Sequence, residues 1–525
     1  MAQAIDVLND TVREELPQMF VDIEPEVAPM FAKIKRTSMG VKSQDGLGKG
    51  FNVIHMYETG TAGLFESGDP LGPGMTSISG NQAQILAEGT AATNLSIFPS
   101  ATEVPHTGEV KRTLTLNKVV GNYSIPAAWK TLDALNAAQL KKVQRDMKAV
   151  AKAKTLYEAT SFFSHEVTNS AGFVNQVLGQ ISAIAEHSTW GDYIVITIDE
   201  EKGRIANFAK GQRLDIVADS SGTLQDGVAT DGTDVRNYTH TTAAYVHLIV
   251  VDVDYLGKKI TLRPINSTTG ALPNYGSGSS GDVFQAGYAA AADDWLVYAR
   301  TTRYVAASRP QFSWGLNNWM KSTGTILGGA TAASGLDVDL YTMLKSQVKA
   351  VNASLTDDII NGYIGGYLDA YPGESLDTII TTQGVQQQWL KQPGTYNGRQ
   401  NYDRTGKALS FKGGWSSISY EFGGRVFEWN ISPMCLSKTL YANKWQGNNI
   451  LRYGPPRIGG ADASMGPELE FLAPLGGHTG VFMVARSSTG APQDLLECPF
   501  WYYELIAPVD PRGIKLTGLT EATLL

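Results

Sequence analysis

Histidines and neighbouring acids are the side chains in this sequence whose chemistry could support catalysis or metal binding. The seven histidines are so widely spread that none lies within four residues of another: His55, His106, His165, His187, His240, His247 and His478. The fold alone would have to assemble a zinc site from them, because a helical zinc motif needs two closely spaced histidines. Adjacent acids such as Glu14 and Glu15 point in different directions on a helix or strand, which excludes a local general acid–base pair. We therefore expect solvated charges at these positions.

Two glycine-rich stretches come close to ligand-binding motifs without matching them. The run GYIGGYLDAYPG at 362–373 resembles a phosphate cradle but lacks the strand-to-helix context of one, so we interpret it as a loop. A second stretch carries four aspartates without the twelve-residue spacing of a calcium loop: Asp219, Asp226, Asp231 and Asp234. The chain has neither a Gly-Lys-Ser/Thr phosphate loop nor a nucleophile elbow. These patterns predict no enzyme activity, no cofactor and no metal site.

The composition is that of a folded, loop-rich protein. With 525 residues, 42% of them hydrophobic, the chain can form two to four domains or one domain with insertions. A net charge of −8 argues against a dedicated nucleic-acid binder, whose domain is usually strongly basic. The 55 glycines and 22 prolines, with many Thr, Ser and Asn residues, indicate substantial β structure.

Cysteine usage and the N-terminus indicate a protein made in a reducing cytoplasm. Cys435 and Cys498 are too few for a disulfide scaffold, and we expect buried free thiols. The N-terminal residues are acidic where a secretion signal needs a basic start and an apolar run. No stretch approaches eighteen apolar residues, so we expect no membrane span.

The strongest helix signal runs from about Thr131 to Ser164, without a glycine or proline. Its apolar seam is Leu140, Val143, Met147, Val150 and Tyr157, and its basic stripe is Lys141, Arg145, Lys148 and Lys152. At 100° per residue the stripe lies about 150° around the axis from the seam. The seam is expected to pack on the chain's own sheet. The stripe is either a solvated face or a contact for an acidic partner.

Residues 1–36 form an acidic N-terminal arm. Pro17, Pro25 and Pro29 predict short helical pieces, because an interior proline removes a hydrogen bond and clashes with the preceding turn. The arm either lies on a neighbouring subunit or packs on its own domain. Its candidate partners for the basic stripe are Glu14, Glu15 and Asp22.

A long glycine-rich excursion follows the arm, from residue 37 to about 126. Strand-like runs at 49–57 and 110–120 enclose some fifty residues without helical periodicity. Compact domains rarely tolerate so long an irregular connection, so we predict a long hairpin that functions by lying on another molecule. Its candidate subunit contacts are Phe51, Val53, Leu114 and Leu116.

The remainder of the chain alternates β-rich and mixed segments. The sequence predicts a short helical patch at 173–187, and then a small barrel or sandwich with strands at 192–199, 213–219, 245–254 and 259–265. Further predictions are a strand at 295–306, a helix at 337–355, a strand followed by a helix at 374–392, and strands at 417–430, 480–486, 500–510 and 513–518.

In this order the elements resemble the major capsid proteins of tailed double-stranded DNA bacteriophages, which share the Hong Kong 97-type fold. The resemblance rests on the arm, the two-stranded excursion and the long helix. It continues through GLNNWMKSTGTILGG, the strand–helix unit ESLDTIITTQGVQQQWL and the late strand GIKLTGL. The β segment at about 190–270 departs from the minimal pattern and resembles the small domains that larger members insert.

The resemblance implies an α+β Hong Kong 97-type capsid fold with an arm, an extended β-hairpin loop, a spine helix, peripheral and axial domains, and an inserted β-barrel-like domain. The expected boundaries are 1–36 for the arm, 37–126 for the extended loop, 127–190 and 285–350 for the peripheral domain with the spine helix, 191–284 for the inserted domain, 351–490 for the axial domain and 491–525 for a C-terminal return strand of the peripheral domain.

The resemblance also implies a structural function. The chain would self-assemble into pentamers and hexamers of an icosahedral shell around the phage double-stranded DNA, which it would contact without sequence specificity. The expected partners are a separate scaffolding protein, because the arm starts at Met1, a portal protein and, where the shell carries one, a decoration protein. The protein would be made in the bacterial host cytoplasm and end in the virion capsid. The alternatives are an encapsulin-like nanocompartment shell and a β-rich cytosolic hydrolase with a carboxylate pair assembled by the fold.

Overall fold

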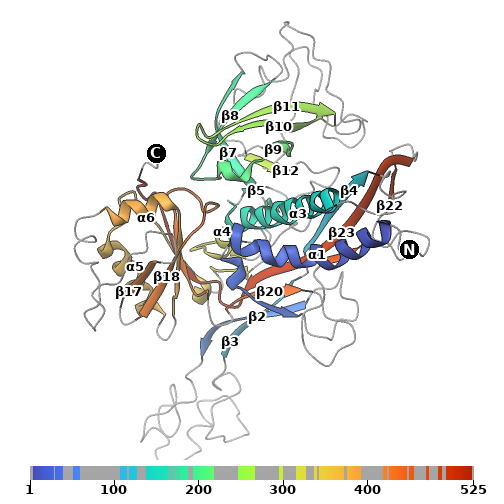
Figure 1. The fold of residues 1–525 in the computed structure, drawn as a ribbon. Coiled ribbons are helices and arrows are strands. Elements are labelled where there is room, and N and C mark those ends of the chain that lie inside the picture. Colours follow the sequence, from blue (N-terminus) through green and yellow to red (C-terminus); the bar gives the residue numbers. More distant parts are fainter. Residues whose placement is uncertain are drawn as a thin grey trace, which may run out of the picture. The chain divides into compact units, whose positions relative to one another are not determined.

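The computed structural model of the chain has two compact units, Met1–Lys49 with Thr115–Leu525, and Gly50–Leu114 (Figure 1). It is a mixed structure of helices and sheets. The structure describes residues 4–28, 30–38, 51–59, 107–114, 117–126, 137–164, 167–169, 172–174, 177–186, 193–217, 246–266, 295–298, 315–326, 336–339, 342–371, 375–391, 418–422, 425–445, 449–454, 469–471, 483–486 and 492–522. Among these residues, no helix is long and apolar enough to cross a membrane.

The N-terminal arm is one helix, α1 (Ala4–Val27), followed by the short 3-10 helix η1 (Phe31–Lys33). The predicted break into short pieces is wrong, because α1 contains both Pro17 and Pro25. A regular apolar face offsets the hydrogen bonds that the prolines remove. That face is fully or almost fully buried and consists of Val12, Leu16, Phe20 and Ile23.

The predicted long helix is confirmed as α3 (Ala137–Phe163), while 131–136 lie outside the described residues. Its fully buried apolar face is centred on Val143, Met147 and Ala151. Leu140, Val150 and Tyr157 of the predicted seam are only half-buried. The buried face of the helix is therefore rotated from the predicted seam toward Ala151. Figure 1 shows α1 and α3 side by side, and their buried faces share one apolar cluster with Phe500 and Tyr502.

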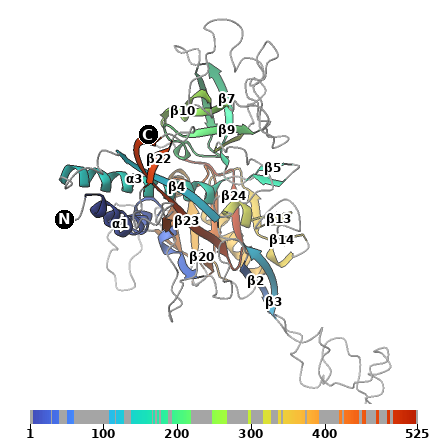
Figure 2. The same ribbon diagram turned by 90° about the vertical axis from the view of Figure 1, so that its right-hand side faces the viewer.

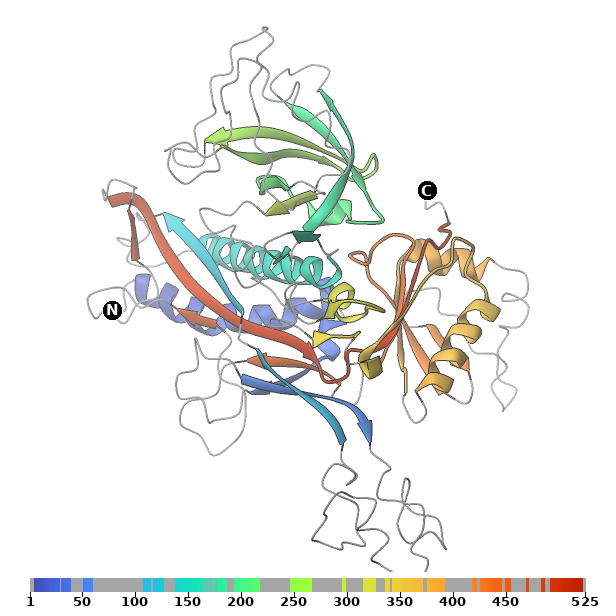
Figure 3. The same cartoon turned by 180° about the vertical axis from the view of Figure 1, so that it is seen from behind.

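The first sheet lies under these two helices. Its strands are β1 (Lys35–Ser38), β4 (Asn117–Pro126), β20 (Ile450–Gly454), β21 (Leu469–Phe471), β22 (Met483–Arg486) and β23 (Pro492–Pro508). The 17-residue strand β23 is its axis and pairs with β4 from Leu495 to Glu504. Figures 2 and 3 show these two strands side by side. The predicted axial domain 351–490 therefore does not hold together as one sheet, since β20, β21 and β22 all pair with β23.

A closed barrel interrupts the chain after α3, in the strand order β10-β11-β8-β7-β12-β9. The strands are β7 (Val177–Glu186), β8 (Ile194–Asp199), β9 (Arg213–Val217), β10 (Val246–Asp254), β11 (Lys259–Asn266) and β12 (Trp295–Tyr298). The predicted small β domain is confirmed as a barrel. The helix predicted at 173–187 is wrong: β7 occupies it, because pairing with β8 and β12 satisfies its backbone. The barrel also draws strands from both sides of the predicted insertion 191–284.

The second sheet has the order β15-β24-β19-β16-β18-β17 and packs against two helices. Its strands are β15 (Gln347–Ala350), β16 (Thr378–Thr381), β17 (Ile418–Phe422), β18 (Arg425–Ile431), β19 (Leu440–Asn443) and β24 (Gly513–Thr517); the helices are α5 (Asp357–Ala370) and α6 (Gln383–Leu390). The strand–helix unit predicted at 374–392 is confirmed by β16 and α6.

Three sequence predictions fail in this region. The loop predicted at 362–373 is mostly α5, which buries Ile360, Ile364 and Tyr367 at helical spacing despite its glycines. The helix predicted at 337–355 is replaced by short elements that end in β15. The segment 491–525, predicted as a C-terminal return strand of the peripheral domain, contributes strands to both sheets. Strand β23 belongs to the first sheet and β24 to the second.

The unit Gly50–Leu114 contains the antiparallel pair β2 (Phe51–Thr59) and β3 (Thr107–Leu114). The run predicted at 49–57 corresponds to β2, whereas the run predicted at 110–120 is divided between β3 and β4 of the first sheet. The middle of the excursion lies outside the described residues. The remaining short elements, all in the other unit, are β5 (Val167–Asn169), β6 (Gly172–Val174), η3 (Ile205–Asn207), α4 (Leu316–Trp319), β13 (Thr325–Ile326), β14 (Leu336–Asp337) and η4 (Thr342–Leu344).

Candidate subunit-contact site

The outer surface of α3 carries the basic stripe. All four predicted residues, Lys141, Arg145, Lys148 and Lys152, are exposed. Because the helix buries Val143, Met147 and Ala151 on its other side, the stripe faces away from the first sheet. This exposure is the geometry that the helical periodicity predicted. A contact between the stripe and another subunit stays a prediction.

The acidic candidates of α1 lie on the neighbouring helix surface. Glu14 and Asp22 are exposed, and Asp22 accepts a hydrogen bond from Gln18 Nε2 at 2.8 Å. Glu15 is half-buried, and its two carboxylate oxygens each accept from Gln144 Nε2 of α3 at 3.1 Å. The structure therefore uses Glu15 within the chain, whereas Glu14 and Asp22 face outward.

One ion pair joins the two charged surfaces at their common edge. Lys148 Nζ lies 3.4 Å from Glu26 Oε2, and both side chains are more than half exposed. Exposed pairs of this kind contribute about 0–1 kcal/mol. The pair shows that α1 supplies the acidic neighbour of Lys148 within the same chain, through a residue that the sequence reasoning did not select.

The predicted contacts in the hairpin are only partly described. Phe51 pairs with Leu114 across the two strands, and Val53 pairs with Arg112. Leu116 lies outside the described residues. Backbone pairing therefore brings three of the four hairpin candidates onto one two-stranded ribbon.

Beneath the exposed faces, four charged side chains are buried together between α1, α3 and the first sheet. They are Glu24, Lys154, Glu158 and Arg452, which we call the buried charge cluster. None of the four residues is more than 6% exposed. Arg452 of β20 donates to Glu24 Oε1 at 2.6 Å and to Glu158 Oε1 at 3.2 Å. Lys154 donates to Glu158 Oε2 at 2.7 Å and lies 4.0 Å from Glu24 Oε1. Two cations thus neutralise two carboxylates.

The electrostatics of this cluster keep Lys154 charged. Burial by itself would lower the pKa of Lys154, because water no longer solvates its ammonium group. The negative charge of Glu158, supported by Glu24, outweighs the burial and raises that pKa above its ordinary value. Lys154 Nζ also lies 3.9 Å from the ring centre of Tyr502, a cation–π contact with β23. The cluster is therefore an ionised junction of two helices and two strands.

Sequence reasoning missed this cluster although a signal for it exists. Lys154 and Glu158 follow Met147 and Ala151 at spacings of three, four and seven, so they continue the buried face of α3. Their own spacing of four residues is that of a helical ion pair. Nothing in the sequence points to Glu24 and Arg452, which are separated by 428 positions.

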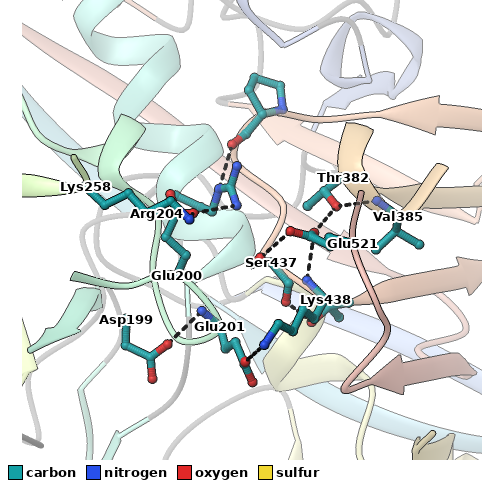
Figure 4. A network of polar contacts seen from close by, with 12 residues as sticks. Asp199, Glu200, Glu201, Arg204, Lys258, Thr382, Val385, Ser437, Lys438 and Glu521 are labelled. Carbon is teal, nitrogen blue, oxygen red and sulfur yellow. Dashed lines mark hydrogen bonds and ion pairs between the residues drawn. The ribbon is translucent and has the colours of Figure 1, made fainter. Parts of the chain in front are cut away.

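A second polar junction connects the C-terminal segment with the second sheet (Figure 4). The Glu521 carboxylate accepts from Ser437 Oγ at 2.6 Å, from the Lys438 amide at 2.9 Å and from the Thr382 hydroxyl. Burial by itself would raise the pKa of Glu521, but the hydrogen bonds to its charged form outweigh the burial and lower it. Thr382 also caps the N-terminus of α6.

The turn at residues 432–438, which contains Ser437 and Lys438, contacts the barrel. Lys438 Nζ lies 2.5 Å from Glu201 Oε1, and the Ser437 amide donates to the Glu200 carbonyl at 2.9 Å. Arg204 Nε donates to the Pro433 carbonyl at 3.3 Å. Figure 4 shows that the turn contacts the barrel on one side and Glu521 of the C-terminal segment on the other. We call this whole set of contacts, including those of Glu521, the barrel clamp.

The described residues bring no group of three or more metal-ligating side chains together. The four aspartates between 219 and 234 lie outside the described part of the chain. Both cysteines are buried free thiols, as predicted. Burial raises the pKa of the Cys498 thiol to about 12, so it is not a reactive thiolate at neutral pH.

Neither a known family model nor a curated protein matches this chain. Among solved structures it is similar to a chain of the holo-SrpI encapsulin complex from Synechococcus elongatus, with 11% sequence identity and a TM-score of 0.20. The match covers 34% of this chain and 55% of that chain, so it spans about half the length of the encapsulin. At this TM-score the similarity bears on neither fold nor function.

Proposed function

We propose that this chain is the major capsid protein of a tailed double-stranded DNA bacteriophage, a structural subunit and not an enzyme. The observation that carries the proposal is the β2–β3 ribbon. It belongs to a compact unit of its own, and its sheet has two strands among the described residues. An isolated two-stranded hairpin is at best marginally stable in water, so a second protein surface has to cover it. A shell of identical subunits supplies such a surface for every copy.

The order of elements supports the same proposal. An N-terminal helix precedes the ribbon, and a long helix on the first sheet follows it. A barrel is then inserted before the second, helix-covered sheet. This matches the arm, extended loop, spine helix, inserted domain and axial domain that the sequence resemblance implies. The buried charge cluster fits a structural role, because its charged groups neutralise one another.

The partners follow from this function as further proposals. Copies of the chain form the pentamers and hexamers of the shell, guided by a scaffolding protein and closed around a portal protein. A decoration protein covers the shell where one is present, and the inner surface contacts packaged double-stranded DNA without reading its sequence. The mature protein resides in the virion capsid after synthesis in the host cytoplasm.

The test is whether the expressed full-length chain forms closed shells. Gradient sedimentation and negative-stain electron microscopy should show particles of many hundred subunits, either from the chain alone or on co-expression with its scaffolding protein. A species that stays monomeric under all these conditions, with the ribbon protected from proteolysis, would refute the proposal. Particles filled with a protein cargo instead of DNA would identify an encapsulin-like compartment.

A further inference from the structure

Two exposed helix faces of opposite charge lie on the same unit of this chain. The acidic face of α1 comprises Glu14, Gln18, Val21, Asp22, Pro25 and Glu26; the basic face of α3 comprises Lys141, Arg145, Lys148 and Lys152. We propose that the acidic face of one copy binds the basic face of a second copy of this chain. The inference rests on the proposed function and names the surfaces that would join neighbouring subunits.

The two faces match in spacing and length. Exposed residues recur at intervals of four, three and four on both helices, from Glu14 to Pro25 and from Lys141 to Lys152. At 1.5 Å per residue each face is about 17 Å long. The three acids of the acidic face, Glu14, Asp22 and Glu26, are spread over about the same length as the four cations of the basic face, so opposite charges can meet along both faces.

The acidic face also leaves an apolar side chain uncovered. Val21 is 41% exposed in the middle of this face, beside Asp22. Other large apolar residues of the same helix, such as Leu16 and Phe20, are buried, and Met19 and Val27 are partly buried. A partner helix that covers Val21 removes apolar surface from water and adds a non-electrostatic contribution to the charge pairing.

The geometry of the helices favours an intermolecular contact. Both are anchored by their buried faces in one apolar cluster, so neither can turn its outer face toward the other. At their common edge, Lys148 of the basic face reaches Glu26 of the acidic face within the same chain. A contact of the basic face with the acidic face of the next copy uses different surfaces on the two partners. Such a heterologous contact closes into rings when its rotation allows, as a pentamer or hexamer requires.

A polyanion such as DNA is the less suitable occupant of the basic face. The acidic face lies on the adjacent helix, and the chain carries a net charge of −8. A nucleic acid on the basic face would therefore meet repulsion from its immediate surroundings. A second copy presents the acidic face of α1, which is about as long as the basic face.

The experiment uses two charge-reversed variants of the full-length chain. Glu14→Lys with Asp22→Lys reverses the acidic face, and Lys141→Glu with Arg145→Glu reverses the basic face. Each variant alone should lower the fraction of protein in particles at least tenfold, because like charges then face each other in every contact. An equimolar mixture should regain particles in part, since every contact between the two variants pairs opposite charges. A ring of six can alternate the variants completely, while a ring of five keeps one contact between like variants. A misfolded variant could not be rescued in this way.

A matched control carries the same charge change elsewhere. Lys210→Glu with Arg213→Glu reverses two exposed cations of the barrel and should assemble as wild type does. Added salt should weaken wild-type assembly, because it screens the charges. Equal loss of particles in the control would overturn the inference, since net charge alone would then explain the effect.

Further outcomes separate this inference from the proposed function. Wild-type particles together with fully assembling variants would overturn the inference alone. Normal assembly of the Lys141/Arg145 variant with loss of binding to a double-stranded DNA fragment would assign the basic face to nucleic acid and overturn the inference. If the wild type forms no particles, the proposed function fails. An equimolar mixture of variants that still sediments as monomers would then overturn the inference separately.

Discussion

At the scale of single residues, the buried charge cluster costs free energy of folding but fixes how α1 packs on α3 and β20. Moving ions out of water costs several kcal/mol each, and good pairing is needed to offset that cost. Here the guanidinium of Arg452 contacts carboxylates from both α1 and α3. The cluster therefore holds the N-terminal helix in one register on the long helix and on β20, which apolar packing alone specifies less sharply.

Removing the guanidinium should destabilise the subunit strongly. Arg452→Met leaves two buried carboxylates facing one ammonium group, and we expect a loss of about 3–5 kcal/mol in the free energy of unfolding. Chemical denaturation of the unassembled subunit, followed by circular dichroism, measures this loss. Arg213→Met, at an exposed position of the barrel, is the matched control and should change stability by less than about 0.5 kcal/mol. Equal stabilities of the two variants would contradict an essential role for the cluster.

Glu521 should make the barrel clamp sensitive to acid. Its pKa is below the ordinary value of 4.5 in the folded chain, so its contribution to stability is complete above about pH 4.5. That contribution disappears as the pH falls through the lowered pKa, because protonation removes the charged acceptor. Hydrogen exchange of the Lys438 amide, corrected for the intrinsic effect of pH, should then accelerate about fivefold to tenfold.

Glu521→Gln is the control for this acid effect. The variant should exchange the Lys438 amide faster already at neutral pH and should lack the additional acceleration in acid. The amides of β10 and β11 should keep their protection in both proteins, because the barrel has its own apolar core. Unchanged exchange in the wild type between about pH 6 and pH 3 would show that Glu521 does not hold the clamp.

At the scale of elements, the arm is a helix because one side of it is buried. Prolines at 17 and 25 oppose helix formation, yet the apolar residues at 12, 16, 20 and 23 form a regular stripe against α3 and β23. Tertiary burial of this stripe decides the conformation of the arm. Intrinsic helix propensity alone would leave it broken.

Two alanine substitutions separate the buried and exposed sides of this helix. Leu16→Ala should cost about 2–5 kcal/mol, because Leu16 is fully buried and a cavity would remain. Val21→Ala should change the stability of the unassembled subunit by less than about 0.5 kcal/mol, since Val21 is substantially exposed. Denaturant midpoints of the two variants measure the difference. Similar midpoints would mean that the arm does not pack as described.

At the scale of the whole molecule, folding and assembly should be separable. The unit Gly50–Leu114 is distinct from the unit that contains both sheets and the barrel. Phe51 and Leu114 are paired across the ribbon, so a short glycine linker can rejoin residues 50 and 115. The shortened chain should unfold at nearly the wild-type denaturant concentration.

The same shortened chain should form no particles if the ribbon serves subunit contacts. Sedimentation and electron microscopy of wild-type and shortened chains, expressed in parallel, test this. A linker variant that folds and still assembles normal shells would show that the ribbon is dispensable. A variant that fails to fold would show that the ribbon supports its own subunit.

The sequence by itself determined the elements whose signals are local. Helical periodicity indicated α3 and its basic stripe, β-rich runs indicated the barrel strands β8 to β11, and a strand–helix pattern indicated β16 with α6. Only the tertiary structure decided that β7 is a strand, that α1 continues through two prolines and that β23 and β24 serve different sheets. It also decided that Glu24 meets Arg452. The physical reason is that backbone pairing and burial between segments far apart in the chain outweigh local propensity, and the sequence of either segment alone does not name its partner.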